Sequence, residues 1–200
     1  MSTATIASPP RRGLVLADAI PGARVRDAAL VLGGAAFTAL LAQLSINVPG
    51  SPVPITGQTL AVGLVGATLG FRRGTAAMLL YALLGLVLPV YADGASGWDV
   101  VWGANGGYIV GFVIATAVIG LMAERGADRK ALTAFVAFAL AQVLVFGFGL
   151  VGLKLATDES WGWVVHNGFT IFIVGGLVKA AIGAAVLPSA WSLVRRFERR

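Results

Sequence analysis

The chain is divided into six long apolar segments, and this pattern restricts it to folds that cross a membrane. A bilayer core about 30 Å thick needs roughly 20 apolar residues per helix, and most of the segments reach that length. The composition agrees, because 58% of the 200 residues are hydrophobic and only 12% are charged, unlike the residues of soluble domains. We predict an all-α integral membrane protein with six transmembrane helices, at residues 28–46, 54–70, 74–91, 106–123, 131–156 and 168–194.

The second segment is the weakest of the six, because prolines and a glycine at 52–57 leave a short apolar core at 59–70. The basic residues supply separate support for it. Thirteen of the 15 Lys and Arg residues precede the first segment, follow the last, or lie in the second–third and fourth–fifth connections. All 13 share one side of the membrane only if every segment crosses, and the positive-inside tendency makes that side cytoplasmic.

The same charges predict the domain organisation. Residues 1–27 are expected to be a cytoplasmic tail, 28–194 the six-helix membrane domain and 195–200 a basic cytoplasmic C-terminus. The three opposite connections lack Lys and Arg and hold four of the five tryptophans, which prefer the membrane–water boundary. We expect a multi-pass protein of the cell membrane with both termini in the cytoplasm. The net charge of +6 is then a topology signal and does not indicate nucleic-acid binding.

The predicted spans lack the residue sets that an enzyme active site usually needs. It has no cysteine and one histidine, His166, which excludes thiolate chemistry and multi-histidine metal sites. No carboxylate pair, Ser/His/Asp set or metal-binding cluster falls within the predicted spans. We predict no catalytic residue, no metal and no cofactor.

Lys179 is the residue that points most directly to a function, because it lies well inside the last apolar segment. A lysine at the centre of a membrane helix costs about 2.5–3.5 kcal/mol, so it normally faces a wet cavity and has a partner. No carboxylate lies inside any predicted span. The carboxylate of a bound ligand is a natural counter-ion, which makes Lys179 a candidate anchor for an anionic substrate. The alternative is a lysine whose stem reaches an interface.

Two polar stretches beside apolar segments are further candidates. Residues 51–59 are stiffened by proline, and irregular backbone at membrane depth is tolerated where it lines a cavity, so Thr56 and Gln58 are candidate ligand contacts. Residues 103–108 begin the fourth segment at a glycine-rich helix start, where Asn105 and Tyr108 are candidates. An external loop with a helix cap and an Asn N-cap followed by an interfacial tyrosine explain these patterns equally well.

Five short motifs occur in order along the chain: PVPITGQTLAV at 52–62, LGFRRG at 69–74, LLYALLG at 79–85, LPVY at 88–91 and GGYIVGF at 106–112. Together they resemble BioY, the family of biotin-binding S components of energy-coupling-factor (ECF) transporters. The resemblance covers about residues 30–190. Each motif alone is weak, and their ordered series is specific.

The resemblance implies a six-helix, S-component-like bundle that binds biotin from the external side, beneath the loop after the first helix, without hydrolysing ATP itself. Its implied partners are a transmembrane T component, contacted by small residues of the first helix such as Ala35 and Ala39, and two ATPase subunits. The family's last helix often carries Asp-x-x-Lys, whereas this chain has Gly176 and Lys179. The lysine carries over as the contact to the biotin carboxylate, but the acid does not.

The residues and the resemblance combine into one hypothesis, that the protein captures biotin for import. The alternatives are an S component for another vitamin and, from a different class, a small channel or an intramembrane enzyme. In a biotin site, the ureido ring is expected to be held by Gln58, Thr56, Asn105 and Tyr108. The apolar body would then pack against Tyr91 or Trp102, and the carboxylate would lie near Lys179.

Overall fold

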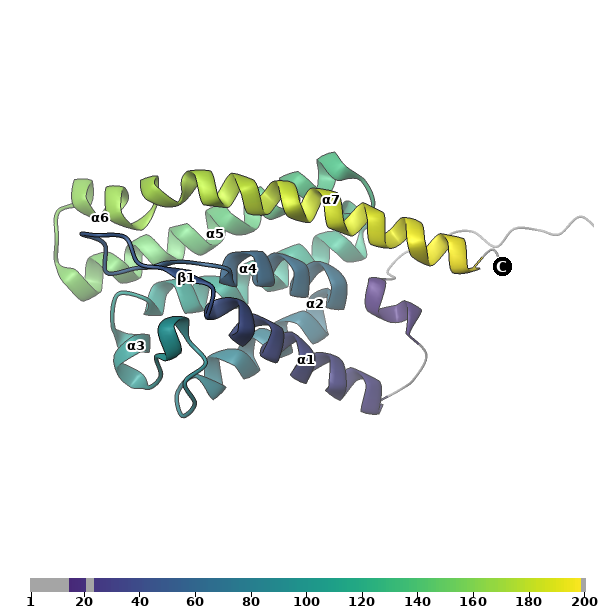
Figure 1. Ribbon diagram of the computed structural model, residues 1–200, viewed down its shortest axis with the longest axis horizontal. Coiled ribbons are helices and arrows are strands. Elements are labelled where there is room, and N and C mark those ends of the chain that lie inside the picture. Colours follow the sequence, from purple (N-terminus) through teal and green to yellow (C-terminus); the bar gives the residue numbers. More distant parts are fainter. Residues whose placement is uncertain (1–14, 21–23, 199–200) are drawn as a thin grey trace, which may run out of the picture.

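The structure is a computed structural model that describes residues 15–20 and 24–198, most of which are helical. The long helices lie side by side along one direction (Figure 1), and the predicted all-α membrane fold is confirmed. Short 3₁₀ turns are η1 (Leu16–Ala19), η2 (Ala92–Gly94), η3 (Ala127–Arg129) and η4 (Thr170–Phe172). The helices are α1 (Arg24–Ala42), α2 (Gln58–Leu84), α3 (Trp98–Trp102), α4 (Gly106–Glu124), α5 (Ala131–Thr157), α6 (Trp161–Gly168) and α7 (Ile173–Glu198).

Helix α2 consists of two antiparallel legs joined by a tight turn at Gly70. Gly70 has φ 79° and ψ −177°, which breaks the helix and is a conformation that essentially only glycine adopts. At the far ends of the legs, Gln58 Nε2 donates a hydrogen bond of 2.6 Å to the Tyr81 hydroxyl. Nearer the turn, a Cβ atom on Gly74 would lie 3.2 Å from the Cα atom of Gly66. The predicted second and third segments are these two legs, packed against each other.

Six longer helical stretches of the described residues form the bundle, which are α1, the two legs of α2, α4, α5 and α7, and α3 and α6 are short helices beside them. Each leg of α2 is shorter than the roughly 20 residues that a full membrane crossing needs. The legs still carry the chain to one end of the bundle and back, as the predicted pair of spans requires. Four stretches of the described residues are long and apolar enough to cross a membrane by themselves, namely Arg24–Ala42, Gly106–Glu124, Ala131–Thr157 and Trp161–Phe197.

Two helices end earlier than the apolar segments predict. Helix α1 stops at Ala42, and strand β1 (Ser45–Ile46) pairs antiparallel with β2 (Ile55–Thr56). The second leg of α2 stops at Leu84, and turns occupy most of the chain from there to residue 91. Strand pairing takes the chain out of the helix after α1, and Pro89 prevents the second leg of α2 from continuing, since proline lacks a backbone N–H and clashes with the preceding turn. Hydropathy alone therefore predicts both segments to extend beyond the ends of the helices.

The connections that carry the basic residues meet at one end of the bundle, which we call the basic end. The turn of α2 touches the end of α4, because the Phe71 amide donates to Glu124 Oε1 at 2.8 Å. The loop after α4 is bonded to the last helix, because Trp191 Nε1 donates to the buried Asp128 carboxylate. The C-terminal end of α7 lies at this end as well (Figure 1). The structure thus gathers Arg72, Arg73, Arg125, Arg129, Lys130, Arg195 and Arg196 at the basic end.

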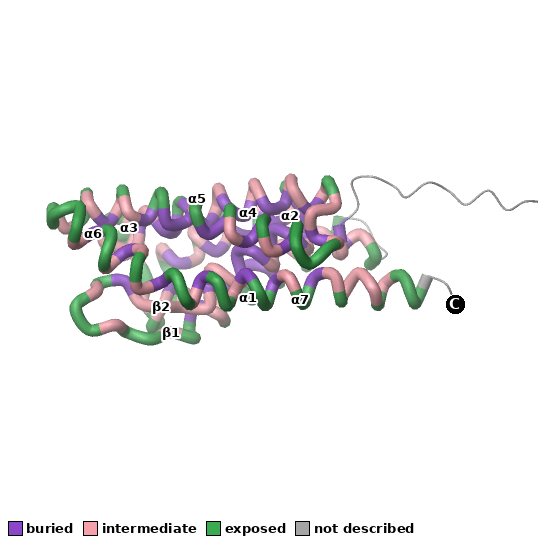
Figure 2. The backbone as a smooth tube through the Cα atoms, turned by 90° about the horizontal axis from the view of Figure 1, so that it is seen from above, coloured by how far each residue is buried: buried purple, intermediate pink, exposed green. Residues whose placement is uncertain are grey.

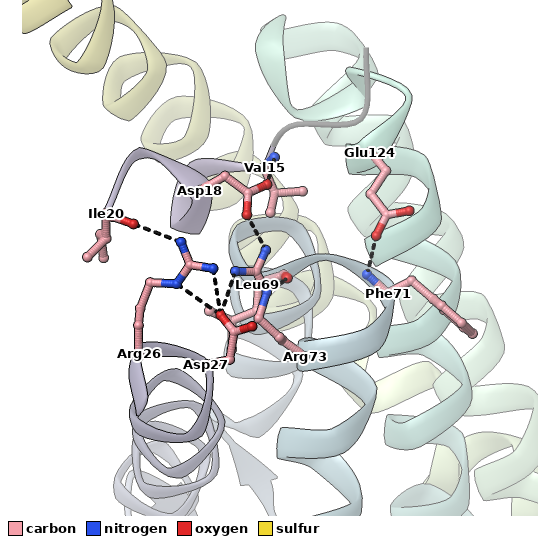
Figure 3. Close-up of polar contacts among 9 residues, drawn as sticks. All are labelled: Val15, Asp18, Ile20, Arg26, Asp27, Leu69, Phe71, Arg73 and Glu124. Atoms are coloured by element: carbon pink, nitrogen blue, oxygen red, sulfur yellow. Dashed lines mark hydrogen bonds and ion pairs between the residues drawn. The ribbon is translucent and has the colours of Figure 1, made fainter. Parts of the chain in front are cut away.

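Part of the predicted tail packs on the basic end. Figure 3 shows Arg73 of α2 in ion pairs with Asp18 of η1 and Asp27 of α1, at 2.5 and 3.3 Å. Val15 beside η1 is 2% exposed and belongs to the apolar core. Residues 15–20 are thus folded onto the bundle, while 1–14, 21–23 and 199–200 of the predicted termini lie outside the described residues.

Close helix contacts build the interior of the bundle. Helix α4 approaches the turn of α2 so closely that a Cβ atom on Gly120 would lie 2.7 Å from the carbonyl carbon of Gly70. Small residues allow such backbone contact in membrane bundles. Buried residues, purple in Figure 2, run through the interior along the length of the bundle. This packing holds the helix ends that form the cavity described next.

Candidate ligand-binding cavity

A cavity lies at the end of the bundle opposite the basic end. Its walls come from the β hairpin, the start of α2, residues 91–100, α4, α5 and α7. It contains about 650 Å³ of empty space, counting its open mouth, and its lining is mostly apolar. Sites for small organic ligands are typically concave and apolar with a few placed polar groups. The polar and aromatic polar lining residues are Thr56, Gln58, Thr59, Tyr91, Asn105, Tyr108, Gln142 and Lys179.

Lys179 is the charged residue of this lining, and no Asp or Glu of the described chain joins it there. Its side chain reaches from α7 to the start of α2, where Nζ donates to the Thr56 carbonyl at 2.5 Å and to Thr59 Oγ1 at 2.9 Å. Both acceptors are neutral, and none of the ion pairs between described residues involves Lys179. The ammonium is therefore oriented at the cavity wall while its charge remains unbalanced.

The β hairpin forms one side of the cavity. Pairing of Ser45 with Thr56 closes the hairpin, and its loop lies beside α6 in Figure 1. The Ser51 hydroxyl lies 2.9 Å from the Asn167 carbonyl of α6, within hydrogen-bonding distance. Val53 packs inward with 5% exposure and lines the cavity. The loop after the first helix therefore lines one side of the cavity.

Gln58 and Thr56 line the cavity, but their side chains are already paired with each other. The Thr56 hydroxyl donates to Gln58 Oε1 at 2.8 Å, and Gln58 Nε2 donates to the Tyr81 hydroxyl. Gln58 is 6% exposed and Tyr81 is 1% exposed. This network connects the hairpin to both legs of α2. These hydrogen bonds hold this part of the cavity wall in shape.

Tyr91 and Tyr108 contribute aromatic walls. The Tyr91 hydroxyl donates to the Ala82 carbonyl at 2.7 Å, and its ring stands edge-to-face with Tyr81 at 5.6 Å between centroids. The Tyr108 hydroxyl donates to the Gly168 carbonyl at 2.8 Å. Both hydroxyls are engaged with the protein, so the two residues offer mainly ring surface to a ligand.

Asn105 and Trp102 differ in their relation to the cavity. Asn105 directly precedes α4, lines the cavity, and its side-chain amide makes no hydrogen bond to a described residue. Trp102 ends the short helix α3 with 77% of its surface exposed and is not part of the lining. The structure brings six of the seven predicted ligand contacts together and leaves Trp102 at the surface.

Gln142 and Gly176 are lining residues that the sequence analysis did not propose as contacts. Gln142 Nε2 donates to the Gly176 carbonyl at 2.6 Å, and a Cβ atom on Gly176 would lie 2.9 Å from that nitrogen. The amide of Gln142 therefore fills the space that a side chain at position 176 would need. A polar glutamine inside the apolar fifth segment was the available signal for it.

The two alanines expected to contact a partner do not share an exposed surface. Ala35 is 2% exposed and lies in the chain's own core, and Ala39 is partly buried against that core. The open side of α1 instead borders an apolar groove with α2 and α7, at Gly33, Phe37 and Val186 among others. Packing of α1 against α2 accounts for the burial of Ala35.

Comparisons with known proteins agree with this arrangement. The model of the BioY family matches residues 12–196. The chain belongs to the BioY family. It is 36% identical over 157 residues to the biotin transporter BioY2 of Lactococcus lactis, covering 76% of this chain and 83% of that protein. It is 33% identical over 153 residues to the biotin transporter BioY of Thermotoga maritima, covering 75% and 88% of the two chains.

A solved structure has the same fold as this BioY family member. It is the crystal structure of the S component for biotin from an ECF-type ABC transporter, and it matches with a TM-score of 0.74 at 23% identity. The match covers 88% of this chain and 92% of that chain. The family is one of transporter components, and the protein is not an enzyme.

Proposed function

We propose that this protein is the substrate-binding membrane component of a biotin uptake transporter. The BioY relatives are named biotin transporters, and the structure with the same fold is described as an S component for biotin. The observation that carries the proposal is the cavity itself, in which one unbalanced ammonium, Lys179, stands in a mostly apolar lining. Biotin matches that chemistry, since it combines one carboxylate with an apolar body and a neutral hydrogen-bonding ring.

In this proposal the biotin carboxylate pairs with Lys179 and supplies the missing negative charge. The apolar body of biotin packs against Tyr91 and the ring of Tyr108. The ureido group faces the polar lining, where the side-chain amide of Asn105 makes no hydrogen bond to a described residue. Gln58 and Thr56 hold this lining in shape through their mutual hydrogen bond.

We also propose the orientation and the partners. The basic end faces the cytoplasm of a plasma membrane, with both termini on that side, because positively charged connections remain on the cytoplasmic side. The cavity then opens outward, where biotin arrives. A transmembrane T component and two ATPase subunits would drive import. The T component would dock on the apolar groove beside Gly33 and Phe37 of α1, because Ala35 is buried in the chain.

The test is equilibrium binding of radiolabelled biotin to the purified protein, with Lys179→Ala as the perturbation. Removing one partner of a largely desolvated charge pair costs about 2–4 kcal/mol, so we expect biotin to bind roughly 30- to 700-fold more weakly. Wild-type protein should also prefer biotin over biotinamide, which lacks the negative charge. That preference should vanish in Lys179→Ala.

Lys154→Ala is the matched control. Lys154 also lies in an apolar helix, but its ammonium pairs with the exposed Asp158 at 2.9 Å and is not part of the cavity. Its loss should leave biotin affinity unchanged. Full affinity in Lys179→Ala would remove the anchor role from Lys179 while leaving biotin capture in place. Competition by thiamine or riboflavin where biotin fails would favour another vitamin, and ion conductance or solute turnover in liposomes would favour a channel or an enzyme.

A further inference from the structure

The side-chain amide of Gln142 is incompletely bonded in the wall of the cavity. Gln142 on α5 is 8% exposed and belongs to the lining. Its Nε2 donates to the Gly176 carbonyl, but its Oε1 is buried and accepts no hydrogen bond from any described residue. Burying an amide oxygen without a donor is unfavourable, and such groups in native proteins call for an explanation.

The orientation of this amide follows from its neighbour. The Gly176 carbonyl can only accept, so the nitrogen of the Gln142 amide must face it and the oxygen must take the other position. The glycine also makes the arrangement possible, because a Cβ atom at position 176 would lie 2.9 Å from Nε2 and 3.4 Å from Oε1. The unpartnered group is therefore a hydrogen-bond acceptor, and what it lacks is a donor.

Most of the other neutral polar side chains of the lining are already hydrogen-bonded to other groups of the protein. Gln58 is bonded at both ends of its amide, to Thr56 and to Tyr81. The hydroxyls of Tyr91 and Tyr108 donate to backbone carbonyls. Among the described lining residues, Gln142 Oε1 is thus the buried acceptor without a partner.

We propose that Gln142 is a specificity-determining residue, whose Oε1 accepts a hydrogen bond from a ring N–H of the bound ligand. This inference rests on the proposed function, under which that donor is a ureido N–H of biotin. Binding then supplies the missing hydrogen bond, and a ligand without the N–H leaves the oxygen unpaired. A site built around a buried polar group rejects such an analogue strongly.

The first test compares ligands on wild-type protein. Biotin and its two N-methyl analogues, each lacking one ureido N–H, are measured by equilibrium binding. One of the two analogues should bind roughly 5- to 150-fold more weakly than biotin, the range expected when a buried acceptor loses its donor. Equal affinity for biotin and both analogues would overturn the role of Gln142.

The second test replaces the acceptor. Gln142→Met keeps the length of the side chain and removes both polar atoms. We expect biotin to bind more weakly by a similar factor, the discrimination against the sensitive N-methyl analogue to disappear, and the unliganded protein to unfold at the same temperature or higher. Weaker binding of all three ligands with the discrimination retained would indicate a merely structural residue and refute the proposal.

A control variant separates these effects from the general removal of a buried oxygen. Thr116 is fully buried, its Oγ1 also has no partner among the described residues, and it is not in the cavity lining. Thr116→Val should leave the affinities for biotin and both analogues unchanged. Wild-type protein that binds biotin tightly but ignores N-methylation refutes the Gln142 inference alone, whereas wild-type protein that does not bind biotin refutes the proposed function and this inference with it.

Discussion

Replacing Gly70 by alanine should destabilise the turn that folds α2 into two legs. Gly70 has φ 79° and ψ −177°, and a residue with a side chain is strained there by about 1–3 kcal/mol. The new Cβ atom would also lie 2.9 Å from Glu124 Oε1, which must move away. That movement weakens the hydrogen bond from the Phe71 amide to Glu124, worth about 1 kcal/mol. The expected total is a loss of about 2–4 kcal/mol in the free energy of unfolding.

The assay is thermal unfolding of the purified protein in detergent at one fixed heating rate, because unfolding of such proteins is often irreversible. At about 3 °C per kcal/mol for a chain of this size, the apparent midpoint should fall by about 6–12 °C. Gly147→Ala is the control, since a Cβ atom there meets no atom within 4 Å on an ordinary helix. Its midpoint should stay the same or rise, because alanine favours helix over glycine by about 1 kcal/mol. Equal midpoints for the two variants would refute the strained positive-φ turn at Gly70.

Three other substitutions test other parts of the structure. Gly85→Ala should weaken biotin binding by roughly tenfold or more, because its Cβ atom would lie 2.1 Å from the Tyr91 ring and displace that wall of the cavity. Arg73→Gln should increase hydrogen exchange at residues 15–20 without changing biotin affinity, because it removes the ion pair to Asp18. Asp128→Asn should raise the unfolding midpoint at pH 8 and change it little at pH 3, because burial raises the pKa of the Asp128 carboxyl above its ordinary value.

The direction of the expected change in the unfolding midpoint of Asp128→Asn follows from proton linkage. A carboxyl whose pKa is raised by folding favours the folded state below its ordinary pKa of 3.8, and this contribution is lost as the pH rises through the raised value. Asparagine cannot ionise, so the variant should show less of this pH dependence. An unchanged pH profile would contradict the burial argument. Full biotin affinity in Gly85→Ala would show that the close contact of Gly85 with the Tyr91 ring does not position that wall of the cavity. Unchanged hydrogen exchange at residues 15–20 in Arg73→Gln would show that the ion pair to Asp18 does not hold those residues on the bundle.

The sequence predicts the class and course of this fold because both depend on properties of short segments. The length of each apolar segment identifies the spans. The positions of the arginines require the second span, although its apolar core is short, to bring the chain back to the basic end. The structure shows that return as the first leg of α2, which ends at Gly70 just before Arg72. The ends of α1 and of the second leg of α2 were less predictable, since hydropathy does not register where proline and strand pairing stop a helix.

The candidate site was partly predictable for the same reason. A lysine deep in an apolar segment is conspicuous in the sequence, and Lys179 does line the cavity. Trp102 also has the residue type of a ligand contact, but it ends a short surface helix and stays outside. Which aromatic side chains face a cavity depends on how separate helices pack, and that information is not local.

What the sequence alone determined is a membrane protein of six apolar helices with one unbalanced positive charge in its last span, because chain length, hydropathy and charge are properties of each segment by itself. What only the tertiary structure decided is which polar groups remain available to a ligand. Gln58 is bonded to Tyr81 and Thr56, whereas Gln142 fills the space beside Gly176 and its buried Oε1 has no hydrogen-bond partner among the described residues. Hydrogen bonds between residues far apart in the chain form only when the helices pack, and in the part of the chain that the structure describes their pairing leaves Gln142 Oε1 without a donor.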